Sequence, residues 1–135
     1  MEHFSFVEMC ASQRADEEGI KNNPFPEACD NLMALVDNVL DPARKALGKP
    51  ICVNSGFRSE ELNSLIGGSC RSQHLKGEAA DIELGGKTKE ENKVLFDWIS
   101  ENCEYDQLIN EYDYSWVHVS YKREGRNRKQ KIKIG

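Results

Sequence analysis

Two histidines and one aspartate are the side chains of this sequence that best fit a chemical role. His74 and Asp81 flank Gly77, a residue whose backbone turns freely, and His118 lies at the centre of the alternating segment 116–120. Neutral imidazoles and a carboxylate are ligands that zinc accepts, and three protein ligands leave a fourth position open, as catalytic sites require. Each residue alone also fits a structural role, as a surface loop histidine, a turn aspartate or a strand histidine. The third histidine, His3, lies at the terminus and is set aside.

The segment around His74 resembles the S-x-H-x-x-G-x-A-x-D signature of the zinc D-Ala-D-Ala peptidases, the M15 group. Its fixed positions are Ser72, His74, Gly77, Ala79 and Asp81. The segments 55–59 and 116–121 are similar to the motifs that precede and follow this signature in the group. The resemblance covers about residues 24–134 in the right order, which makes it far more specific than a single short motif.

The resemblance implies roles for five residues of this chain. It implies one zinc ion held by His74, Asp81 and His118. It implies that Arg58 binds a substrate carboxylate or polarises the scissile carbonyl, tasks that suit a planar guanidinium. Ser72 is expected either to donate a hydrogen bond to the substrate or to hold its loop.

The general base is the point at which this chain departs from the group. The group often has a carboxylate three residues before the second histidine, where this sequence has Ser115. A hairpin with the loop Asp113-Tyr114 pairs Ile109 with His118 and places Glu111 on the same sheet face. We therefore expect Glu111 to take a proton from the zinc-activated water, with Asp113 as the reserve.

These assignments predict a zinc-dependent peptidase that hydrolyses peptidoglycan stem peptides. Both a D-Ala-D-Ala carboxypeptidase and an L-Ala-D-Glu endopeptidase of the endolysin type are consistent with Arg58, because both substrates offer a carboxylate. The alternative is a non-hydrolytic zinc-binding module for cell-wall recognition or assembly, which Ser115 motivates. The expected partner is peptidoglycan or a muropeptide, and the chain is expected to act as a monomer.

Capping residues and hydrophobic spacing predict the elements that position these side chains. Helices are predicted after caps at Ser5 and Ser12, over residues 27–47, and after caps at Ser59 and Thr88. A loop is predicted over 67–77, and strands are predicted near 51–53 and over 79–84, 105–112, 116–121 and 129–134.

The order of these elements defines the fold class. Helices first and a mostly antiparallel sheet later predict an α+β fold, with the N-terminal helices packed on the sheet. The resemblance implies an arrangement like that of Hedgehog and the D-Ala-D-Ala peptidases. The length of 135 residues predicts one domain, with an N-terminal helical segment over 1–23 and a catalytic core over 24–134.

Charge is distributed unevenly along the chain. The formal net charge is -5, yet residues 122–135 carry seven basic residues and one glutamate, which leaves -11 on residues 1–121. A basic segment of this kind fits a lysine-protected strand edge, a patch for an anionic polymer or a nucleic-acid arm, of which nucleic-acid binding is the least favoured.

Composition excludes several other classes of protein. The five scattered cysteines include no C-x-x-C pair, so we expect reduced thiols and neither a disulfide framework nor a thiolate zinc site. No apolar run reaches the roughly 18 residues of a membrane span, and no secretory signal is visible. We expect synthesis in the cytoplasm and action on the cell wall, with a phage or prophage origin as one route to the wall.

Overall fold

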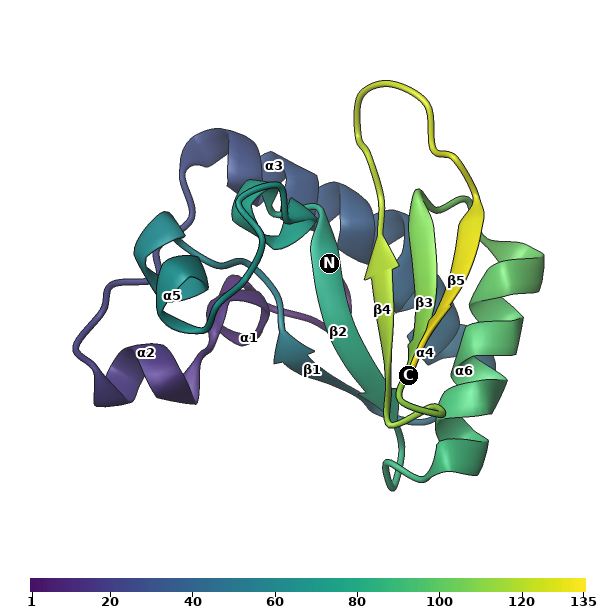
Figure 1. Cartoon of the computed structure of the whole chain (residues 1–135). Helices are drawn as coiled ribbons and strands as arrows, with labels where there is room; N and C mark the ends of the chain where they lie inside the picture. Colours follow the sequence, from purple (N-terminus) through teal and green to yellow (C-terminus); the bar gives the residue numbers. More distant parts are fainter.

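The fold is built on a five-stranded sheet with the strand order β1-β2-β4-β3-β5 (Figure 1). The computed structural model describes residues 1–135. The strands are β1 (Ile51–Ser55), β2 (Ala79–Leu84), β3 (Gln107–Glu111), β4 (Trp116–Ser120) and β5 (Gln130–Ile134). Neighbouring strands are antiparallel except for β3 and β5, which are parallel. The prediction of an α+β fold with a mostly antiparallel sheet is confirmed.

Four of the six α-helices begin at the predicted caps. They are α1 (Phe6–Cys10), α2 (Gln13–Glu17), α3 (Pro26–Leu35), α4 (Asp41–Leu47), α5 (Glu60–Leu65) and α6 (Lys89–Asn102). The side chains of Ser5, Ser12, Ser59 and Thr88 each accept a hydrogen bond from a backbone N–H in the first turn of α1, α2, α5 and α6, respectively. Such caps satisfy amide groups that have no partner inside the helix.

The predicted long helix over 27–47 contains an interruption that the spacing of its apolar residues did not indicate. A π-helical segment, η1 (Val36–Leu40), separates α3 from α4. The N–H of Asp41 bonds to the carbonyl of Val36, five residues back, and Pro42 follows at the start of α4. Proline lacks an N–H and its ring collides with the carbonyl four residues earlier, so the wider turn accommodates it within a continuous helical path.

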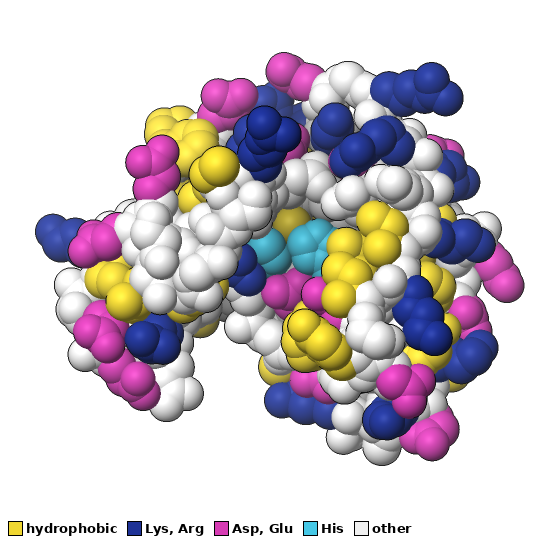
Figure 2. Space-filling model, in the orientation of Figure 1, with side chains coloured by type: hydrophobic (Ala, Val, Ile, Leu, Met, Phe, Trp, Pro, Cys, Tyr) yellow, Lys and Arg dark blue, Asp and Glu magenta, His cyan; other side chains and the backbone are white.

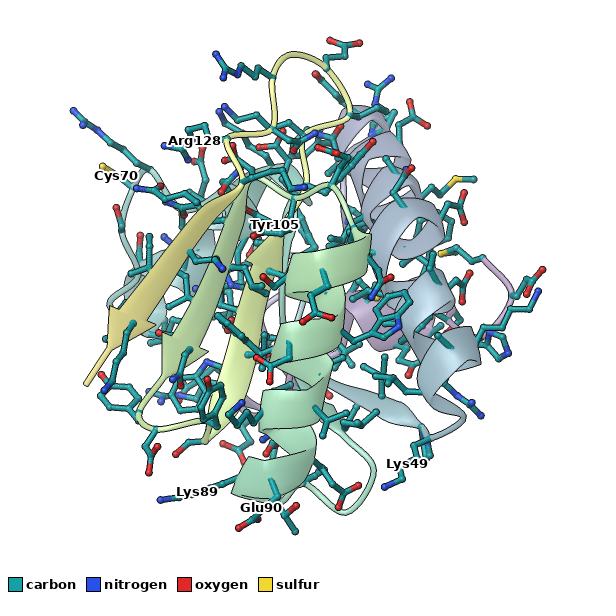
Figure 3. The ribbon with its side chains drawn as sticks, turned by 90° about the vertical axis from the view of Figure 1, so that its right-hand side faces the viewer. Lys49, Cys70, Lys89, Glu90, Tyr105 and Arg128 are labelled. Atoms are coloured by element: carbon teal, nitrogen blue, oxygen red, sulfur yellow. The ribbon has the colours of Figure 1, made fainter.

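One face of the sheet packs against helices, and the other face carries the polar side chains of the candidate site. The core cluster joins α3, η1 and α6 residues to alternate positions of the central strands, such as Ile82 of β2 and Val117 and Val119 of β4. Figure 3 shows α6 lying against this face of the sheet. Because strand side chains alternate between faces, Asp81 and His118 lie on the opposite face.

The β3–β4 hairpin has the predicted register but a different turn. Ile109 pairs with His118 and Glu111 with Trp116, as expected. The strand ends at Glu111, so the prediction that it continues to residue 112 and turns at 113–114 is wrong. Residues 112, 113 and 114 all have positive φ, of 50°, 55° and 59°. This left-handed conformation is incompatible with a strand, so the β3–β4 pairing ends at Glu111 and Trp116.

The basic C-terminal segment forms the edge of the sheet. β5 pairs with β3 alone, which fits the strand-edge interpretation of residues 122–135. All five cysteines are free thiols. No helix has the length and apolar character needed to cross a membrane.

Candidate active site

A cleft of about 590 Å³ opens on the free face of the sheet. Its lining includes the residues that the sequence singled out, which are Arg58, Ser72, His74, Asp81, Glu111 and His118. Figure 2 shows two histidine side chains at the base of this hollow, with acidic side chains next to them. The cleft lining is strongly polar, because Ile109 and Trp116 are its two hydrophobic members.

His74 is held in one orientation by its loop. It belongs to a 3-10 helix, η2 (Gln73–Lys76), within the predicted loop, and Ser72 Oγ accepts a hydrogen bond of 3.2 Å from its N–H. Its ring Nδ1 lies 2.7 Å from the carbonyl oxygen of Gly56. A carbonyl only accepts, so Nδ1 carries a proton and Nε2, which faces Asp81, is the ring nitrogen available to bind a metal ion. This is the arrangement that a metal-binding histidine requires.

His118 and Asp81 face each other across two paired strands. They are Cα partners in the β2–β4 ladder, and Nδ1 of His118 lies 2.9 Å from Oδ1 of Asp81. Nε2 of His74 lies 3.4 Å from the other carboxylate oxygen, and the three ligand atoms all lie within 4.8 Å of one another. Two ligands about 2.1 Å from a tetrahedral zinc ion are themselves about 3.4 Å apart. The three side chains therefore fit one zinc ion.

The Asp81 carboxylate is kept in its ionised form. Burial opposes its charge, but the hydrogen bonds and electrostatic attraction of His118 and His74 outweigh burial and hold the pKa of Asp81 well below its ordinary value. An ionised carboxylate at neutral pH is the form that binds a metal ion.

Arg58 is fixed beside this carboxylate. Its Nη2 lies 3.4 Å from Asp81 Oδ2, its Nη1 lies 3.4 Å from Asn63 Oδ1, and its side chain is 15% exposed. Burial lowers the pKa of Arg58, and the charges of Asp81 and Glu111 oppose that change. The guanidinium therefore stands in the cleft with a set orientation, which suits it to bind a second anion.

Glu111 is the carboxylate that the hairpin brings into the cleft. The indole Nε1 of Trp116 donates a hydrogen bond of 2.7 Å to its Oε2. Asp113, the reserve base, is 74% exposed, pairs with Lys89 at 3.1 Å and does not line the cleft. Ser115 is also outside the cleft, where its hydroxyl donates to a carbonyl of the turn.

Comparison with known proteins agrees with this geometry. A family model described as Peptidase M15 matches residues 2–120. The chain belongs to the peptidase M15 family. A zinc D-Ala-D-Ala carboxypeptidase from Streptomyces albus G is 49% identical to this M15 chain over 49 residues, which are 36% of the chain and 19% of that protein. The chain thus matches about a fifth of the relative's length. The predicted family is confirmed, and the relative supports the predicted class, a zinc metallopeptidase, and its cofactor.

Sequence reasoning missed several groups that support the site of this M15 family member. The Gly56 carbonyl orients His74, Asn63 contacts Arg58, and Trp116 donates to Glu111. A carbonyl belongs to every residue, so no side-chain pattern marks Gly56. The hydrogen bond between Trp116 and Glu111 did have a signal in the sequence, because the hairpin register places these two residues opposite each other.

Proposed function

We propose that this chain is a zinc-dependent peptidase that hydrolyses an amide bond next to a D-residue in peptidoglycan stem peptides. The observation that carries the proposal is the convergence of two imidazole nitrogens and one carboxylate within 4.8 Å, in a cleft that also contains Glu111 and Arg58. The zinc D-Ala-D-Ala carboxypeptidase relative supports the choice of substrate.

The proposed mechanism assigns one task to each side chain. His74, Asp81 and His118 would hold the zinc ion, which when bound polarises a carbonyl and acidifies water. Glu111 takes a proton from the attacking water and later delivers it to the leaving amine. Arg58 binds a carboxylate of the peptide and so fixes the scissile bond in the cleft.

Two bonds of the stem peptide fit these assignments. The D-Ala-D-Ala bond is followed by a free terminal carboxylate, and the L-Ala-D-Glu bond lies beside the α-carboxylate of D-Glu. Arg58 can bind either carboxylate. The similarity to a zinc D-Ala-D-Ala carboxypeptidase favours the carboxypeptidase, and the endolysin-type endopeptidase is the other outcome of the test.

The test is digestion of purified peptidoglycan and of a synthetic stem pentapeptide by the zinc-loaded protein, with products identified by mass spectrometry. We expect release of D-Ala or cleavage after L-Ala. Glu111→Gln should lower kcat by about 10² to 10⁴ while zinc content stays the same, because it removes the general base and no ligand.

The exposed Glu101 on α6 provides a matched control, since Glu101→Gln makes the same change of charge outside the cleft. It should leave kcat unchanged. Binding of zinc without any product, together with no effect of Glu111→Gln, would contradict the peptidase and favour the non-hydrolytic wall-binding module.

A further inference from the structure

The cleft is positively charged although the chain is acidic. The formal net charge of the chain is -5, yet the cleft lining has five lysine and arginine side chains against three carboxylates. Figure 2 shows lysine and arginine side chains gathered along the upper rim of the hollow, above the two histidines. Such a concentration of one charge attracts and orients a ligand of the opposite charge.

Two of the five cations are neutralised within the protein, and three are not. Arg58 pairs with Asp81 at 3.4 Å, and Arg128 pairs with Asp106 at 2.7 Å. The remaining three, Arg71, Lys76 and Lys122, form no ion pair, and their charged groups form no hydrogen bond in the structure. The Glu78 carboxylate also lines the cleft but forms no ion pair with them, so three positive charges face one negative charge and favour an anion that enters from outside.

The β2–β4 register brings two of these cations, Lys76 and Lys122, to one end of the cleft. Ala79 pairs with Ser120, and the N–H of Tyr121 donates to the Glu78 carbonyl. The segment that precedes β2, with Lys76, and the segment that follows β4, with Lys122, therefore lie side by side. In Figure 1, η2 and the end of β4 lie at the same end of the sheet.

Arg71 reaches the same end from the loop before η2. Figure 3 shows its neighbour Cys70 at the end of the molecule that also carries Arg128, where β5 begins. We call the three unpaired cations, Arg71, Lys76 and Lys122, the rim cluster.

The rim cluster and Glu111 lie on opposite sides of His118 along the sheet. Glu111 pairs with Trp116, two residues before His118, whereas Lys122 lies four residues after it. An extended chain rises about 3.3 Å per residue, so Lys122 is at most about 13 Å from His118 along β4. An extended peptide substrate also rises about 3.3 Å per residue. If its scissile bond lies at the metal ligands, the substrate group that reaches the rim cluster is within about four residues of that bond.

We propose that the rim cluster is a second anion subsite, which binds a second carboxylate of the substrate, separate from the one at Arg58. This proposal rests on the proposed function and defines its substrate class as peptides with two carboxylates within about four residues of each other. The stem pentapeptide L-Ala-γ-D-Glu-L-Lys-D-Ala-D-Ala has this property, with one carboxylate on D-Glu and one at its C-terminus.

The test measures peptide binding with a substrate that is not consumed. Zinc-loaded Glu111→Gln protein is titrated with the pentapeptide and with two derivatives, one amidated at D-Glu and one at the C-terminus. The same titrations are repeated after Arg71→Gln, Lys76→Gln and Lys122→Gln are added together. We expect the triple substitution to raise the Kd of the unmodified peptide about tenfold, since several partly exposed ion pairs of modest strength act together.

The amidated peptides show whether the effect is local. The triple substitution should change the Kd of one of them by no more than about twofold, because that peptide already lacks the carboxylate at the rim cluster. The matched control replaces the exposed Lys21, Lys45 and Lys87, which lie outside the cleft, by glutamine. It makes the same change of net charge and should leave every Kd within about twofold, since distant exposed charges are screened.

Three results would overturn the subsite: equal effects of the triple substitution on all three peptides, an effect no larger than that of the control, or no binding of any peptide. Turnover of the unmodified peptide by the wild type is measured separately. Absence of turnover with the expected pattern of Kd values would contradict the peptidase and retain the subsite. Turnover without that pattern would retain the peptidase and reject the subsite.

Discussion

Asp106 ties the basic C-terminal segment to the loop that carries His74, which makes it a sensitive position for mutation. Its side chain is 0% exposed. It accepts hydrogen bonds from Arg128 Nε at 2.9 Å, Nη2 at 2.7 Å and the backbone N–H at 3.1 Å, and from Gln73 Nε2 at 3.2 Å. We predict that Asp106→Asn destabilises the chain, because an amide group of the same shape keeps one acceptor and loses the charge.

The expected cost follows from these contacts. Hydrogen bonds to a charged group contribute roughly 1.5 to 3 kcal/mol, and Asp106→Asn weakens several at once. Arg128 is half exposed and regains water when its partner is neutral, so the larger cost of a stranded buried charge does not apply. We expect the free energy of unfolding to fall by about 2 to 3 kcal/mol. At an unfolding entropy of about 2.1 cal/mol/K per residue, this lowers the Tm by about 7 to 11 °C.

The loss should depend on pH in a defined direction. The hydrogen bond from Arg128 lowers the pKa of Asp106, against the opposing effect of burial. A carboxyl with a depressed folded-state pKa stabilises the protein fully above its unfolded pKa of about 3.9, and this contribution is lost as the pH falls through the folded-state value. The difference in unfolding free energy between wild type and Asp106→Asn should therefore be largest at pH 7 and shrink below about pH 4.

The assay is urea unfolding followed by circular dichroism at pH 7 and pH 3, on metal-free protein so that zinc binding does not add its own pH dependence. Asp97→Asn is the matched control, because Asp97 is half exposed and pairs with Lys93 on the surface of α6 at 2.7 Å. Exposed pairs of this kind contribute little, so the control should unfold like the wild type. Equal midpoints for Asp106→Asn and wild type at pH 7, or an undiminished difference at pH 3, would refute the reasoning.

Two further substitutions test the groups that orient the site. Trp116→Phe removes the indole donor to Glu111, so kcat should fall about tenfold with unchanged zinc content, as expected for one hydrogen bond to a charged group; an unchanged kcat would contradict this role. Gly56→Ala places a Cβ atom 2.0 Å from the Met9 carbonyl oxygen and displaces the carbonyl that orients His74. Zinc affinity, measured by competition with a chelator, should fall about 10- to 100-fold, and wild-type affinity would count against the orienting role.

The fold was predictable where a local pattern determines the local structure. Side chains that alternate in segment 116–120 predicted both the strand and the face of His118, and cap residues such as Ser59 and Thr88 predicted helix starts. The hairpin register followed from a loop centred between residues 113 and 114, a centre that the longer observed turn over 112–115 keeps, and it placed Glu111 in the cleft with His118.

The remaining features depend on contacts between distant segments or on backbone atoms. The Gly56 carbonyl that orients His74 carries no side-chain signature. Asp106 accepts hydrogen bonds from Arg128, 22 residues later in the chain, a contact that sequence spacing does not indicate. The π-helical turn before Pro42 and the left-handed turn after Glu111 are backbone conformations that override the apolar spacing around them.

The most direct test of the central claim is a crystal structure of the zinc-loaded protein with an anomalous difference map at the zinc absorption edge. We predict one peak in the cleft, about 2.0 to 2.2 Å from His74 Nε2, one Asp81 oxygen and His118 Nδ1. A peak at other residues would contradict the account. So would a zinc-loaded crystal with no peak in the cleft, in which His74, Asp81 and His118 contact only one another.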